Sequence, residues 1–187
     1  MHEQAMNGIE GWTTTGSEQA YKNPWFSVRK DTVIRPDGKP GEYFVVERAR
    51  AAVIVAEDAQ GNLVLAQQMR YVIGRRLYEF PAGMIEKGEE PVEAAKRELR
   101  EETGIVAERW EELGIVYPSA GLTDERGHIF LARDLTEGEP ELDGSEDIVT
   151  SRMSPDDIRN YIGSERVQTG FFLAAFTLYE QWKRTNG

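Results

Sequence analysis

The sequence predicts an α+β protein, an α/β/α sandwich in which helices cover a mixed sheet. Strand-like and helix-like segments are mixed along the 187 residues without strict β–α–β alternation, which argues against a Rossmann sheet. One segment, Pro91 to about Thr103, has apolar residues at helical spacing, and residues 167–184 repeat that pattern. Residues 1–48 are expected to form a separate N-terminal antiparallel β-hairpin region ahead of the main domain, residues 49–187.

The N-terminal half is expected to consist mainly of strands. Residues 1–20 are polar and are expected to be partly loose. Residues 25–34 and 43–48 predict two strands around the turn RPDGKPG. Residues 50–56 and 62–68 flank a turn containing DAQG and predict a second hairpin.

A short strand at 78–83 is expected to be broken by Pro81, and further strands are expected near 111–117, 127–133 and 146–152.

Three helices are predicted by local signals. Pro91 suits a first helical turn, and Gly104 suits the left-handed position just past the end of that helix. A second helix should open at Ser154, whose hydroxyl is a good cap. The third should bury a stripe on one face of residues 167–184, made of Phe171, Phe172, Ala175, Leu178 and Trp182.

Composition excludes several classes of function. The net charge of −11 disfavours nucleic acid and anionic membrane as partners. No cysteine and only two histidines, His2 and His128, disfavour a zinc site of the usual type. No apolar run reaches the roughly 18 residues of a membrane span, and the N-terminus lacks a secretory pattern. We therefore expect a cytoplasmic protein.

Three glutamates on the first predicted helix point to a metal site. Glu98 and Glu102 are one turn apart, and Glu101 lies on the same general side. Two carboxylates about 4 Å apart repel by about 4 kcal/mol at an effective dielectric of 20. Hard divalent cations, Mg²⁺ or Mn²⁺, would offset this repulsion, because they favour carboxylate oxygens. The alternative is a merely solvated, glutamate-rich helix.

The segment from Gly83 to Ile105 resembles the signature of the Nudix hydrolases at every fixed position. The matching positions are Gly83, Glu89, Arg97-Glu98-Leu99, Glu101-Glu102 and Gly104-Ile105. The resemblance implies that Glu98 and Glu102 are the main metal ligands, with Glu101 near the metal and the Ala82 carbonyl as a further ligand. It also implies a structural ion pair between Glu89 and Arg97, and makes residues 49–187 the catalytic domain.

The flanking residues resemble the ADP-ribose pyrophosphatase subgroup. Leu77 to Gly83 reads LYEFPAG, which is similar to the Glu-Phe-Pro-Ala-Gly run of that subgroup, and Glu79 within it is a pocket residue or a strand-edge salt bridge. The loop from Tyr117 to Glu125 departs from the subgroup because Ala120 stands where a proline is typical. Nucleotide sugars such as GDP-mannose or ADP-glucose are therefore alternative substrates.

The same resemblance suggests substrate-binding residues. Trp25 and Tyr43 resemble aromatic residues that stack on a base, although both could instead be hairpin core residues. Arg48 and Arg70 fall where the subgroup places arginines that bind phosphate, although either could form a surface salt bridge.

A catalytic base is expected on the acidic loop 137–147. Glu146 resembles the subgroup's glutamate that acts as metal ligand or base, and Glu125 is the second candidate; simple solvation is the alternative for both. Together with Glu102 these residues form the predicted catalytic set. His128 is expected to have no catalytic role.

The resemblance implies a Mg²⁺-dependent (or Mn²⁺-dependent) pyrophosphatase that splits ADP-ribose or a related nucleoside diphosphate sugar. It also implies a homodimer in which the N-terminal hairpin of one subunit completes the other's pocket. Two alternatives are a Nudix domain that senses such a nucleotide without cleaving it, and a house-cleaning pyrophosphatase of damaged nucleoside triphosphates. The intact glutamate set argues against the sensor, and the Glu-Phe-Pro-Ala-Gly run disfavours the triphosphatase.

Overall fold

A computed structural model describes residues 10–142 and 147–186. The chain divides into two compact units. Unit 1 comprises Met1–Ala49 together with Ser119–Glu125, and unit 2 comprises Arg50–Pro118 together with Arg126–Gly187.

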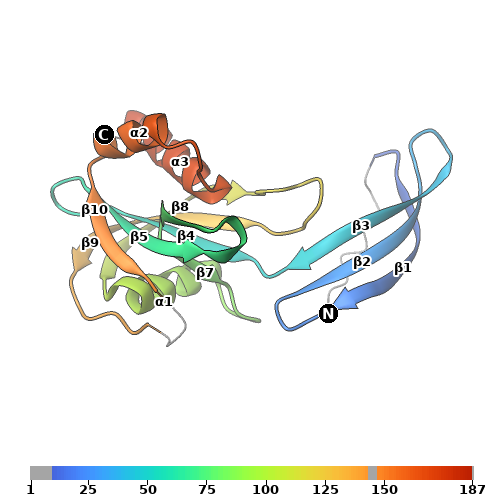
Figure 1. The fold of residues 1–187 in the computed structure, drawn as a ribbon, viewed down its shortest axis with the longest axis horizontal. Helices are drawn as coiled ribbons and strands as arrows, with labels where there is room; N and C mark the ends of the chain where they lie inside the picture. The colour runs from blue at the N-terminus through green and yellow to red at the C-terminus, as the bar shows by residue number, and fades with distance from the viewer. Residues whose placement is uncertain (1–9, 143–146, 187) are drawn as a thin grey trace. The chain divides into compact units, whose positions relative to one another are not determined.

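Unit 1 is a three-stranded antiparallel sheet of β1 (Thr13–Lys22), β2 (Phe26–Ile34) and β3 (Pro40–Arg48), in that spatial order (Figure 1). Residues 1–20 were expected to be partly loose, and from Thr13 onward they form the strand β1, which was not predicted. β1 is almost entirely exposed, so its pairing does not come from a buried apolar face. Besides the backbone ladder, side chains meet across the strands: Lys30 contacts Glu18 at 3.5 Å on one side and Glu42 at 2.7 Å on the other, and the Tyr21 and Phe26 ring centroids are 5.6 Å apart.

The segment Ser119–Glu125 belongs to unit 1 because it pairs with β3. The Val46 amide donates to the Leu122 carbonyl at 2.9 Å, and the Arg48 amide donates to Asp124 Oδ1 at 2.9 Å. A distant loop is thus attached to the same sheet edge as the predicted phosphate-binding Arg48.

Unit 2 contains two sheets. The four-stranded sheet has the order β7-β4-β9-β8, in which β4 and β9 are parallel and the other pairs antiparallel. The three-stranded sheet has the order β10-β5-β6 and is antiparallel. The strand bounds are β4 Ala51–Ala56, β5 Leu63–Arg70, β6 Arg75–Glu79, β7 Ala82–Met84, β8 Val106–Val116, β9 Gly127–Thr136 and β10 Val149–Met153, with a 3₁₀ turn at Tyr71–Ile73.

The second predicted hairpin is wrong in its pairing. Residues 51–56 and 63–70 are strands, but they lie in different sheets and share only an isolated bridge, Glu57 with Leu63. Both edges of β4 are occupied by strands from later in the sequence, β7 and β9. The turn residues therefore predicted where the chain reverses direction, but not which strands pair with each other.

Helices cover both faces of the four-stranded sheet, which confirms the predicted α+β sandwich (Figure 1). Helix α1 (Pro91–Thr103) packs Ala94, Ala95 and Leu99 against one face. Helices α2 (Pro155–Ser164) and α3 (Gly170–Asn186) pack on the other face. Ser154 caps α2 as predicted, because its hydroxyl accepts from the Asp157 amide at 3.1 Å.

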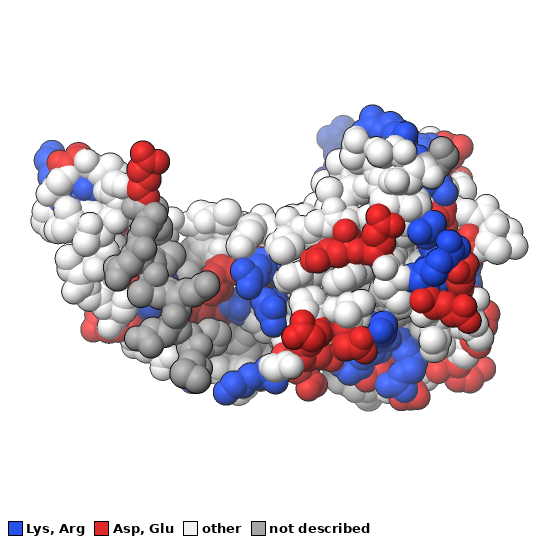
Figure 2. Space-filling view, turned by 180° about the vertical axis from the view of Figure 1, so that it is seen from behind, with Lys and Arg blue, Asp and Glu red and all other residues white. Residues whose placement is uncertain are grey.

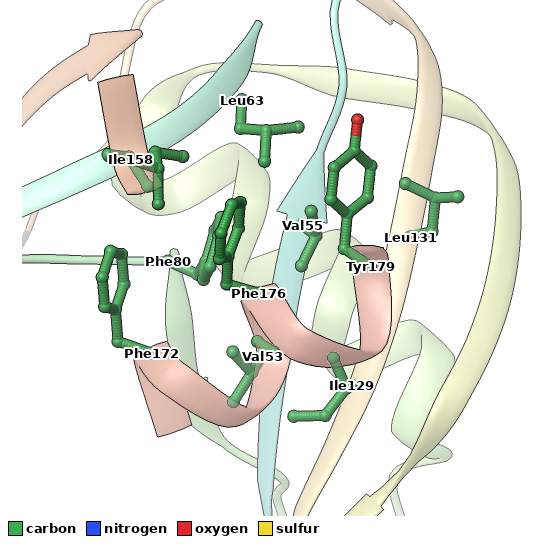
Figure 3. Packing of buried hydrophobic residues seen from close by; sticks show 12 residues of the cluster. Val53, Val55, Leu63, Phe80, Ile129, Leu131, Ile158, Phe172, Phe176 and Tyr179 are labelled. Carbon is green, nitrogen blue, oxygen red and sulfur yellow. The ribbon is translucent and has the colours of Figure 1, made fainter. Parts of the chain in front are cut away.

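The buried stripe of α3 differs slightly from the predicted one. Phe172, Ala175, Phe176 and Tyr179 are buried, while Phe171, Leu178 and Trp182 pack at its margin. The Phe172 ring stacks on Phe80, with 5.3 Å between the ring centroids. Figure 3 shows Phe176 and Tyr179 in the same cluster as Val53, Val55, Ile129 and Leu131 of the sheet. This core holds β4, whose end at Ala51–Val53 carries the pairing with β7.

Acidic and basic side chains are interspersed over the face of unit 2 seen in Figure 2. Among the described residues, no helix is long and apolar enough to cross a membrane.

Candidate active site

The site is built where β7 meets α1. β7 pairs with β4 through Ala51–Met84, Ala52–Gly83 and Val53–Ala82, and this register fixes the Ala82–Gly83 peptide at the sheet edge. α1 begins at Pro91 as predicted and ends where Gly104 adopts the left-handed conformation, with φ of 75°. These local signals set which helix face the glutamates occupy.

Gly83 makes room for the carboxylate of Glu98. A Cβ built on Gly83 would lie 2.0 Å from the carboxyl carbon of Glu98 and 2.1 and 2.2 Å from its oxygens. Gly83 does not have a positive φ, so its role here is to allow close approach and not an unusual backbone angle. The carboxylate of Glu98 therefore lies directly against the Ala82–Gly83 segment, with only 13% of its side chain exposed.

Arg97 connects the loop before α1 to two of the glutamates. Its Nε and Nη2 donate to the two oxygens of Glu89 at 3.0 and 3.1 Å, and Nη2 also donates to the Met84 carbonyl at 3.0 Å. Its Nη1 donates to Glu98 Oε1 at 2.7 Å and to Glu101 Oε2 at 3.1 Å. The predicted contact between Glu89 and Arg97 is present.

The contact between Glu89 and Arg97 shifts the pKa of each group in the direction that favours its charged form. The hydrogen bond from Arg97 lowers the pKa of Glu89 despite partial desolvation. The hydrogen bond to Glu89, followed by those to Glu98 and Glu101, raises the pKa of Arg97. Both groups are therefore charged throughout the neutral pH range.

Glu102 is held by the backbone of β7. Its Oε2 accepts from the Ala82 amide at 3.1 Å, and the residue is 5% exposed. Within residues 10–142 and 147–186, no three acidic or histidine side chains are grouped closely enough to form a metal-binding cluster. Glu98 and Glu101 accept hydrogen bonds from Arg97, and Glu102 accepts one from the Ala82 amide.

Arg70 and Glu79, both predicted to bind substrate, contact each other. Arg70 Nε donates to Glu79 Oε2 at 2.6 Å between neighbouring strands β5 and β6. Glu79 is only 8% exposed, whereas 43% of the Arg70 side chain is exposed. The strand-edge salt bridge considered for Glu79 is thus present, and the Arg70 side chain stays partly exposed.

In unit 1, Arg48 and Glu125 lie together and the two predicted aromatic residues do not. Arg48 Nε is 3.5 Å from Glu125 Oε1. Trp25 directly precedes Phe26, which pairs with Arg48, whereas Tyr43 pairs with Asp31, five residues further along β2. At about 3.3 Å per residue, Trp25 and Tyr43 lie more than about 16 Å apart along the strands. Trp25 is 67% exposed and is therefore not a hairpin core residue.

Glu146, the other predicted catalytic residue, lies outside the described residues. The sequence did not predict two backbone groups that hold side chains of the site. The Met84 carbonyl accepts from Arg97 and the Ala82 amide donates to Glu102, and backbone groups leave no signal in the residue types. His128 is a buried residue of β9 whose Nδ1 lies 2.7 Å from Glu112 Oε1.

A family model described as "NUDIX domain" matches residues 47–170 of this chain. The chain belongs to the Nudix family. A second model, described as "Nucleoside diphosphate sugar hydrolase N-terminal domain", matches residues 12–46 of this Nudix chain. The Nudix family and relatives that are named ADP-ribose pyrophosphatase make the chain a hydrolase.

Two relatives are named ADP-ribose pyrophosphatase. The one from Bacillus subtilis (strain 168) is 33% identical over 82% of this Nudix chain and 84% of its own length. The one from Mycobacterium tuberculosis (strain ATCC 25618 / H37Rv) is 39% identical over 76% of this Nudix chain and 70% of its own length. A solved structure titled "Crystal structure of ADP compounds hydrolase" shares the Nudix fold, with a TM-score of 0.84 and 22% identity over 96% of this chain and 98% of that one.

Proposed function

We propose that the chain hydrolyses the pyrophosphate bond of ADP-ribose or a related nucleoside diphosphate sugar, giving a nucleoside monophosphate and a sugar phosphate. The observation that carries this proposal is the Glu98 carboxylate seated on the Ala82–Gly83 segment in a Nudix chain. Glu102 accepts from the Ala82 amide of the same segment, and Glu101 shares Arg97 Nη1 with Glu98. The relatives named ADP-ribose pyrophosphatase and the match to a nucleoside diphosphate sugar hydrolase N-terminal domain support the substrate class.

The donor set fits hard divalent cations. Every proposed ligand atom is an oxygen: the carboxylates of Glu98, Glu101 and Glu102, the Ala82 carbonyl, and Glu146 as a further ligand or base. Mg²⁺ and Mn²⁺ favour such oxygen ligands. When bound, the cations neutralise the diphosphate and activate the attacking water. Arg97 and Glu89 hold the loop and the helix in a fixed relation around these oxygens.

The remaining proposed roles concern substrate. Arg70, whose side chain is partly exposed, and Arg48 are proposed to bind phosphate oxygens, and Glu79 orients Arg70 through the 2.6 Å hydrogen bond. Glu125, 3.5 Å from Arg48, is the second candidate for the base after Glu146. Trp25, whose ring is exposed, is proposed to stack on the base.

We further propose a homodimer. Trp25 and Tyr43 are separated along one sheet, so they can enclose one base only if they come from two copies of the chain. Residues 1–48 would then serve dimerisation and base binding, and residues 49–187 would carry catalysis. The cytoplasm remains the predicted location.

The test is a comparison of four substrates under one assay. The protein is incubated with Mg²⁺ and, separately, ADP-ribose, ADP-glucose, GDP-mannose and 8-oxo-dGTP, and products are identified by mass spectrometry. AMP with ribose 5-phosphate from ADP-ribose, abolished by EDTA and restored by Mg²⁺ or Mn²⁺, is the expected result. Turnover of 8-oxo-dGTP alone would favour the triphosphatase, and tight binding of ADP-ribose without turnover would favour the sensor. Light scattering after gel filtration measures the oligomeric state.

A further inference from the structure

The segment that follows β9 is fastened to the C-terminal end of α1. The Glu141 amide donates to the Glu101 carbonyl at 2.8 Å. This carbonyl belongs to the last turn of the helix, where carbonyls have no partner within the helix. The segment Glu137–Leu142, called here the docking segment, therefore supplies a partner for one terminal carbonyl of the helix end that carries Glu101 and Glu102.

Two glycines bring the backbones into close contact. A Cβ on Gly104 would lie 2.3 Å from the Gly138 carbonyl oxygen, and a Cβ on Gly138 would lie 2.6 Å from the Gly104 carbonyl oxygen. These atoms are backbone, so they cannot rotate away as a side chain would. The docking segment can lie this close to the helix end only because both residues lack a side chain.

Arg100 joins the docking segment to a glutamate of the active site. Its Nη1 donates to both oxygens of Glu141, at 2.9 and 3.0 Å, and its Nη2 is 3.6 Å from Glu101 Oε1. The other oxygen of Glu101 accepts from Arg97 at 3.1 Å. Glu101 is thus oriented by two arginines, one on each oxygen, and one of those arginines is held by the docking segment.

We propose that Arg100 is a positioning residue for the metal-ligand set, which acts by coupling the docking segment, through Glu141, to the orientation of Glu101. This inference rests on the proposed function only in naming Glu101 as a metal ligand. The pair adds little stability, because 44% of the Arg100 side chain and 63% of the Glu141 side chain are exposed. Its effect lies in orientation, since residues that support metal ligands affect metal affinity by about 10- to 100-fold.

The experiment uses the full chain with Arg100→Glu, Glu141→Arg and the double variant, and Mn²⁺ as the probe. Electron paramagnetic resonance measures the Mn²⁺ dissociation constant, hydrogen exchange reports on the Glu141 amide, and kcat is measured with ADP-ribose. Each single variant is expected to weaken Mn²⁺ binding about 10-fold, to lower kcat and to speed exchange at Glu141. The double variant restores opposite charges at the two positions. Its Mn²⁺ affinity, its kcat and its exchange rate at Glu141 are expected to return most of the way to the wild-type values.

A matched control is the partly exposed pair Arg159 and Glu180, which joins α2 to α3 with hydrogen bonds of 3.0 and 3.1 Å. Reversing either charge there is expected to leave Mn²⁺ binding and Glu141 exchange unchanged. Three results would overturn the proposal. The first is wild-type Mn²⁺ affinity in both Arg100→Glu and Glu141→Arg, and the second is no recovery in the double variant. The third is a wild-type protein that binds no Mn²⁺. A wild-type protein that binds Mn²⁺ but cleaves none of the four substrates would contradict the proposed function instead, and Mn²⁺ affinity and exchange would still decide the role of Arg100.

Discussion

Replacing Gly83 with alanine should separate catalysis from folding. The new methyl group would lie 2.0 Å from the Glu98 carboxyl carbon, whereas ordinary contact begins at 3.4 Å, so the carboxylate must retreat by about 1.4 Å. The obstacle is the far end of a flexible side chain, and Gly83 does not have a positive φ, so the backbone accepts alanine.

The expected loss follows from that displacement. A misplacement of about 1 Å in an active site can lower the rate about 100-fold, which corresponds to about 2.7 kcal/mol of transition-state stabilisation. Stability should fall by about 1.5–3 kcal/mol, the worth of a hydrogen bond to a charged group such as the 2.7 Å one between Arg97 and Glu98.

The assay compares kcat/KM for ADP-ribose, Mn²⁺ affinity and urea unfolding in Gly83→Ala and in a control, Gly163→Ala. A Cβ on Gly163 would meet nothing within 4 Å, and that residue lies in α2, where alanine is the better helix former. The control should retain full activity. Wild-type kcat/KM in Gly83→Ala, measured on folded protein, would refute the reasoning about Glu98.

Three further predictions concern single side chains. Glu102→Gln should lower kcat by about 100-fold or more with an unchanged melting curve, and full turnover at saturating Mg²⁺ would exclude a role for Glu102. Glu89→Gln should be less stable than the wild type above about pH 4.3, because the hydrogen bond from Arg97 lowers the pKa of Glu89 in the folded state. That difference should vanish as pH falls through the lowered pKa, and urea unfolding between pH 3 and 7 measures it. Tyr179→Phe should cost about 1–3 kcal/mol, because the buried Glu57 loses a 2.8 Å hydrogen bond, while kcat with ADP-ribose stays unchanged. Thermal melting and the ADP-ribose assay measure these two quantities, and an unaltered melting temperature would contradict the estimate.

Elements defined by local signals were predictable from the sequence. The bounds of α1 follow from Pro91 and Gly104, and the start of α2 follows from the Ser154 cap. β1 was missed because its residues are exposed and polar, and its pairing depends on contacts such as Lys30 with Glu18, which are not visible along one strand. The pairing of β4 was mispredicted because its partners, β7 and β9, are supplied by distant residues.

Within the site, spacing along a helix was informative and spacing between strands was not. Glu89 lies just before the first residue of α1 and Arg97 lies nearly two turns into the helix, and their contact was predicted by the family pattern. Arg70 and Glu79 were each predicted as substrate-binding, but their mutual ion pair depends on the register of β5 with β6. The contact of Arg100 with Glu141 joins residues 41 positions apart, for which the sequence carries no local signal.

The hydrogen bonds of Arg97 suggest how one residue can serve both structure and metal binding. Two of its nitrogens are committed to Glu89 and the Met84 carbonyl, so the guanidinium keeps its place whatever the other carboxylates do. Glu98 and Glu101 share the remaining nitrogen, Nη1. A divalent cation that draws these two carboxylates toward itself therefore leaves the link between loop and helix intact. A lysine, with one point charge in place of a planar fork, cannot divide its contacts in this way.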